Sequence, residues 1–146
     1  MRWGAVALAV LLVGCSKGRS TDTRSSAFPT STERVRFVKA YVLSPTDFED
    51  AEFHIVLHDN SRGFIAGSDD YDMRIAVRVQ PELVEKWTIG CSEAALSPRF
   101  AWAKEILGAR EGWDVKSKPQ TVVCARGEQR VLHVKEGIIF RQLSAD

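Results

Sequence analysis

Apolar and polar residues alternate along several stretches of this chain, and such alternation is typical of strands that bury one face. The clearest case runs through residues 72–79, where the apolar side chains recur at every second position, and residues 51–58 follow the same pattern. We predict strands over residues 34–43, 51–58, 64–66, 72–79, 120–124, 129–134 and 138–143. Tight turns are expected at residues 126–128 and 135–137, which contain glycine.

Between residues 80 and 108 the spacing of the apolar residues changes to that of a helix. Pro81 suits the first turn of one helix, and a second helix is predicted to begin after Ser97 and to end before Gly108. The expected fold class is therefore α+β: a mainly antiparallel sheet of about five to seven strands with two short helices packed on one face.

The first fifteen residues form a separate unit. Twelve apolar or Gly residues, from 3 to 14, suit a signal peptide and are too few for a membrane span of about 20 residues. The run ends in Leu12-Val13-Gly14-Cys15, which resembles the lipobox of bacterial lipoproteins. The resemblance implies cleavage before Cys15, acylation of that cysteine and, because Ser16 rather than Asp follows it, sorting to the outer membrane. The alternative is an ordinary secretory signal with a chance cysteine.

The chain divides into three expected parts. Residues 1–14 are the signal peptide, and residues 15–33 are a lipid-anchored tether, because nine of the eighteen residues from 16 to 33 are Ser or Thr. Residues 34–146 are a single α+β domain. The lipid bilayer, reached through Cys15, is the first expected partner. The expected location is the bacterial cell envelope, with the domain facing the periplasm or the cell surface.

Charge and motifs exclude several functions. The net charge of +1 over 146 residues gives no basic field for nucleic acid. The motifs of serine nucleophiles and phosphate-binding loops do not occur. His54 and His58 could share a metal on a helix, but on the predicted strand they would lie roughly 13 Å apart. We therefore expect no catalytic residue, no cofactor and no metal.

Cys91 and Cys124 remain once Cys15 is assigned to lipid. An even pair in an exported domain predicts a disulfide between them. Such a bond would stabilise the fold by about 4 kcal/mol through the entropy of loop closure. The alternative is that the two thiols are buried apart as small apolar groups.

Acidic residues are concentrated between residues 47 and 72, which hold eight acids and a single base. One interpretation is that the loop residues Asp69, Asp70 and Asp72, with the loop aromatic Trp113, recognise a protein partner with a basic surface. The alternatives are that arginines on adjacent strands neutralise the acids, and that Trp113 covers the end of the core.

The resulting functional hypothesis is a non-catalytic envelope lipoprotein that binds another protein, of the inhibitor, immunity or assembly-accessory type. The alternative is a small envelope enzyme or a ligand carrier that acts on cell-wall or lipid components. A deep pocket with convergent polar groups would favour the alternative.

Overall fold

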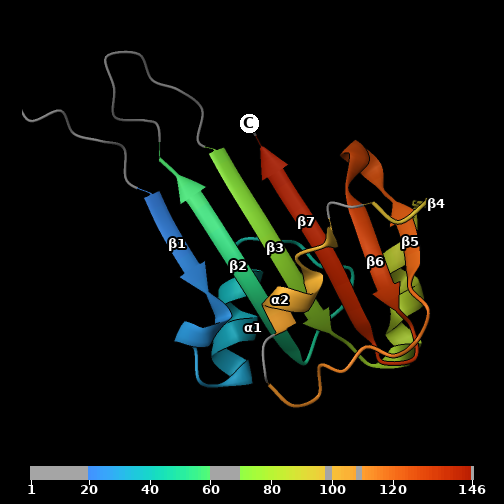
Figure 1. Ribbon diagram of the computed structural model, residues 1–146, viewed down its shortest axis with the longest axis horizontal. Helices are drawn as coiled ribbons and strands as arrows, with labels where there is room; N and C mark the ends of the chain where they lie inside the picture. The colour runs from blue at the N-terminus through green and yellow to red at the C-terminus, as the bar shows by residue number, and fades with distance from the viewer. Residues whose placement is uncertain (1–19, 60–69, 98–99, 108–109, 146) are drawn as a thin grey trace, which may run out of the picture.

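The computed structural model describes residues 20–59, 70–97, 100–107 and 110–145. They form an α+β fold around one antiparallel sheet of seven strands in the order β1-β2-β3-β7-β6-β5-β4 (Figure 1). The strands are β1 (Ser20–Arg24), β2 (Asp50–His58), β3 (Asp70–Arg78), β4 (Ser92–Glu93), β5 (Gln120–Val123), β6 (Gln129–His133) and β7 (Ile138–Ala145). The helical elements are η1 (Ser25–Ala27), α1 (Ser31–Lys39), η2 (Pro81–Thr88), α2 (Ala103–Leu107) and η4 (Ala125–Gly127). The predicted fold class is confirmed.

The alternating pattern predicted the central strands correctly. Phe53 of β2 lies opposite Ile75 of β3, and both side chains are buried on the same face. His54 lies opposite Arg74 on the other face, as the alternation requires. The expected strand over residues 64–66 lies outside the described residues.

The strand expected over residues 34–43 is wrong, because residues 31–39 form helix α1. Thr30 caps the helix in a capping box: its hydroxyl accepts from the Glu33 amide at 3.3 Å, and its amide donates to the Glu33 carboxylate at 3.1 Å. The helix is fixed to the sheet by Arg34, which is 3% exposed and donates two hydrogen bonds to Asp50 at 2.8 and 2.9 Å.

The tether expected over residues 15–33 is wrong for residues 20–33, and residues 15–19 lie outside the described part of the chain. β1 pairs with β2 along all five of its residues, so backbone hydrogen bonds order this segment despite its polar composition. Polar side chains suit a strand at the edge of a sheet. The segment is also fixed by the buried Ser25, whose hydroxyl donates to Glu52, and Glu52 accepts a second hydrogen bond from Arg110.

Helical elements cover both faces of the sheet, and Figure 1 shows α1 behind it and α2 in front of it. On what we call the α1 face, α1 and η2 pack on a core that includes Val38, Phe53, Ile75, Trp87 and Leu132. On the α2 face, α2 packs on a core that includes Trp102, Leu107, Trp113, Ile138 and Phe140. The two helices predicted from sequence, η2 and α2, therefore lie on opposite faces. The reason is that β7 is apolar on both sides, so each face needs a cover.

Candidate functional site

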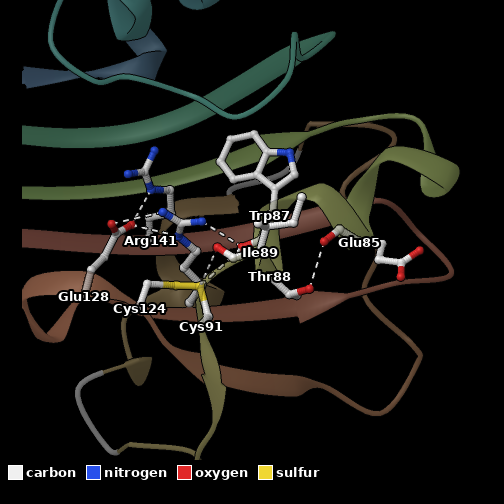
Figure 2. Close-up of a disulfide and its surroundings, with 9 residues drawn as sticks. Glu85, Trp87, Thr88, Ile89, Cys91, Cys124, Glu128 and Arg141 are labelled. Atoms are coloured by element: carbon white, nitrogen blue, oxygen red, sulfur yellow. Dashed lines mark hydrogen bonds and ion pairs between the residues drawn. A yellow bond between two sulfur atoms is a disulfide. The ribbon is translucent and has the colours of Figure 1, made fainter.

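The predicted disulfide between Cys91 and Cys124 is present, with the two Cα atoms 4.1 Å apart (Figure 2). Cys91 follows η2, and Cys124 lies between β5 and η4. Both cysteines pack against the core of the α1 face. The bond therefore ties η2 to the last β-hairpins of the sheet.

A charged cluster lies beside the disulfide (Figure 2). Glu128 accepts hydrogen bonds from Arg130 at 3.0 Å and from Arg141 at 2.6 Å, and both guanidinium groups lie over the ring of Trp87. Burial alone would raise the pKa of Glu128, but the hydrogen bonds from the two arginines outweigh burial and hold this pKa below its usual value. Arg141 also donates to the Leu43 carbonyl at 2.9 Å, so the cluster positions the chain that follows α1.

The acidic segment is neutralised within the fold. Five of its eight acids form ion pairs with basic side chains: Asp47 with Lys39, Glu49 with Arg78, Asp50 with Arg34, Glu52 with Arg110, and Asp72 with Arg74. Asp70 begins β3 opposite His58, and Asp69 lies outside the described residues. Asp70 and Asp72, the two described carboxylates of the proposed recognition surface, therefore both have partners within the fold.

Trp113 is also not an exposed anchor for a partner. Its side chain is 3% exposed in the core of the α2 face, and the Arg78 guanidinium lies 5.6 Å from the centre of its ring. The alternative stated above, that Trp113 covers the end of the core, is the one that the structure supports.

One edge of β7 is open because β6 is shorter than β7. The last pair between them joins Arg130 to Arg141, whereas β7 continues through residues 142–145, which pair only with β3 on the other side. In the described part of the chain no strand pairs with this edge. A cavity of about 620 Å³ lies there, and we call it the β7 notch. Its walls include Tyr41, Leu43, Tyr71, Arg126, Gln142 and Leu143.

The walls of the β7 notch combine exposed apolar groups with a free cation. Leu43 is 93% exposed and Tyr41 is 44% exposed, so both side chains present apolar surface to solvent beside the open strand edge. Arg126 is exposed in the turn before β6 and has a positive φ of 61°. No ion pair joins Arg126 to another residue of the described chain. The sequence predicted this turn, but the notch depends on the unequal lengths of β6 and β7, which the pattern did not indicate.

A second cavity lies on the α2 face and has a volume of about 750 Å³. Its lining is mainly apolar and includes Leu96, Phe100, Leu107, Val115, Val131 and Phe140. Lys104 of α2 and His133 of β6 also contribute to its walls. The ring Nδ1 of His133 lies 2.9 Å from the Ser117 carbonyl, so this nitrogen carries the donated hydrogen. We call this space the α2-face cavity.

The remaining sequence candidates are not brought into one site. His54 and His58 lie on strand β2, and His54 contacts Asp22 at 2.9 Å. Within residues 20–59, 70–97, 100–107 and 110–145, no three metal-ligating side chains form a cluster. No helix in these same ranges has the length and apolar character needed to cross a bilayer.

Comparison with protein families, with curated proteins and with solved structures gives no match to this chain. Function is therefore inferred from the residues of this chain, and in particular from the chemistry of the β7 notch and of the α2-face cavity.

Proposed function

We propose that this protein is a membrane-anchored envelope lipoprotein whose domain is a non-catalytic module that binds another protein. The anchor is proposed from the lipobox at residues 12–15. The observation that carries the binding role is the open edge of β7 beside the exposed Tyr41 and Leu43. An inhibitor, immunity or assembly-accessory protein would use such a surface.

An open strand edge favours a protein partner over a small substrate. Its backbone N–H and C=O groups form a row that an extended peptide can extend as an added strand. Natural proteins usually protect such edges, and β4 at the end of this sheet is only two residues long. The β7 edge lies inside a cavity whose walls mix apolar side chains with polar ones, which suits an inserted strand that carries both kinds of side chain.

The charge in the notch indicates the chemistry of the partner. Glu128 pairs with both Arg130 and Arg141, and the Arg141 side chain is buried, so Arg126 is the exposed cation among the described walls of the notch. We therefore propose an extended segment that carries one apolar side chain for Leu43 and one acidic side chain for Arg126. This sign is opposite to that of the basic partner expected from the acidic segment.

The anchor is tested by metabolic labelling with a radioactive or clickable fatty acid. The wild-type protein should take up the label and sediment with membranes, whereas Cys15→Ser should do neither. Equal labelling of the two proteins would overturn the anchor and leave the binding role to be judged separately.

The binding role is tested with a photo-crosslinking amino acid placed at Leu43, and at Ile89 as the matched control. Ile89 is 77% exposed and lies outside the notch. A crosslink to one envelope protein is expected from position 43 only. With that purified partner, the amides among residues 142–145 that point away from β3 should gain protection from hydrogen exchange, and Arg126→Glu should weaken binding. Crosslinks of equal yield from both positions, or unprotected amides, would contradict the proposal.

A further inference from the structure

We propose that the α2-face cavity binds a single-chain amphiphile with a carboxylate head, such as a fatty acid. The cavity adjoins the β7 notch, with which it shares the wall residue Phe100, but the inference does not depend on the binding role proposed for that notch. It would give the domain a second function, the sensing or carrying of an acyl chain at the membrane surface.

The size and lining of the cavity fit an apolar ligand. Ligand pockets span about 300–1,000 Å³ and are lined mainly by apolar and aromatic side chains with a few polar groups. The α2-face cavity, at about 750 Å³, lies within this range. Its walls come from α2, from the sheet strands β6 and β7, and from the segment before β5. Leu96 at the lining is 57% exposed, although it is a large apolar side chain.

Among the described residues, the helix on the α2 face is shorter than the helical cover of the α1 face. α2 has only five residues, whereas α1 has nine, and α1 covers the opposite face together with the eight residues of η2. The cavity is open to solvent on one side, so its apolar lining is in contact with water, and covering that lining with an apolar group is favourable. An acyl chain would cover the lining and leave no polar group in contact with it.

The charge on the cavity selects the head group. Lys104 lines the cavity, is exposed on α2, and forms no ion pair within the described chain. The described lining contains no acidic side chain. A carboxylate on the ligand would therefore find a cation without a competing anion, while a cationic head group would meet Lys104 with like charge.

The experiment uses the full chain with Cys15→Ser, which removes the anchor, and measures binding of laurate by calorimetry and by methyl NMR. We expect saturable binding that shifts the methyl signals of Leu107 and Val131. Octanoate, with four fewer methylenes, should bind at least about a hundredfold more weakly, because each buried methylene contributes roughly fourfold. Dodecyltrimethylammonium, with the same chain length and a positive head, should also bind more weakly than laurate.

Two variants locate the site. Lys104→Glu should weaken laurate binding roughly fivefold, in keeping with one partly exposed ion pair, and Lys86→Glu on η2 is the matched control that should change nothing. Ala103→Trp fills the cavity and should abolish binding. No shift of the Leu107 and Val131 methyls at saturating laurate would overturn the proposal. Equal affinity for the anionic and cationic amphiphiles would overturn the role of Lys104, even if Ala103→Trp failed to fold.

Discussion

The two faces of the sheet are covered in different ways. The α1 face buries Phe53 and Trp87 almost completely beneath α1 and η2, and the disulfide fastens this cover. On the α2 face the described helix α2 has five residues, and a cavity of about 750 Å³ lies beside it. The α1 face therefore supplies the tighter packing that stabilises the fold. The α2 face contains the cavity in which we propose that a ligand binds.

The sharpest test compares Trp87→Ala with Leu107→Ala. Trp87 is fully buried on the α1 face and donates a hydrogen bond to Thr46 at 2.9 Å, so its loss should cost about 4–5 kcal/mol of unfolding free energy. Leu107 already borders a cavity, so truncating it should cost about 2 kcal/mol. Urea unfolding of both variants measures the difference. Equal losses would mean that the two faces contribute alike.

The disulfide gives the next largest effect. The double variant Cys91→Ser and Cys124→Ser should lose about 4 kcal/mol of unfolding free energy, because the open loop regains entropy in the unfolded chain. Since both cysteines pack on the α1 face, hydrogen exchange should rise first in η2 and β5. The double variant should still bind laurate under conditions where it is folded. Simultaneous loss of laurate binding in the folded variant would break the proposed separation of the faces.

The smallest expected effect is a pH dependence of the unfolding free energy that arises from Glu136. This residue is hydrogen-bonded to Ser117, which contacts His133 in the wall of the α2-face cavity. Hydrogen bonds from the Ser117 hydroxyl, and from the amides of Ser117 and Lys116, lower the pKa of Glu136 to about 2. Because the folded pKa lies below the unfolded value of about 4.5, the stabilisation is complete above pH 4.5 and is lost as the pH falls toward 2. A carboxyl NMR titration of Glu136 should show the low midpoint. Glu136→Gln should remove this part of the acid sensitivity, while Glu82→Gln, on the α1-face element η2, should not.

Local patterns predicted the central strands, because burial on one face imposes a period of two on β2 and β3. The pattern at residues 34–43 was ambiguous: Val35, Val38 and Val42 recur at helical spacing as well. The capping box of Thr30 and Glu33 was the local signal that would have favoured the helix.

The candidate sites were less predictable, since they arise from contacts between distant parts of the chain. The ion pair of Arg110 with Glu52 joins residues 58 positions apart, and nothing in the sequence shows that this acid is neutralised. Likewise, β7 extends four residues beyond its last pair with β6, and the sequence does not show this difference because it depends on how the two strands pair. Cysteine counting predicted the bond between Cys91 and Cys124 because the assignment of Cys15 to lipid left these two cysteines with a single possible pairing.

Because β1 begins at Ser20, the domain must lie close to the membrane if Cys15 carries a lipid. Only four residues lie between Cys15 and the first residue of β1, Ser20, and the five Cα-to-Cα steps that join them span at most about 18 Å. The β7 notch lies at this same end of the sheet, because Ser20 pairs with His58, and Ala145 of β7 pairs with Tyr71 at the start of β3. A lipid on Cys15 would therefore hold the notch against the bilayer. A partner anchored in the same membrane would meet it at a high effective concentration, so even a weak strand-to-strand contact would be occupied.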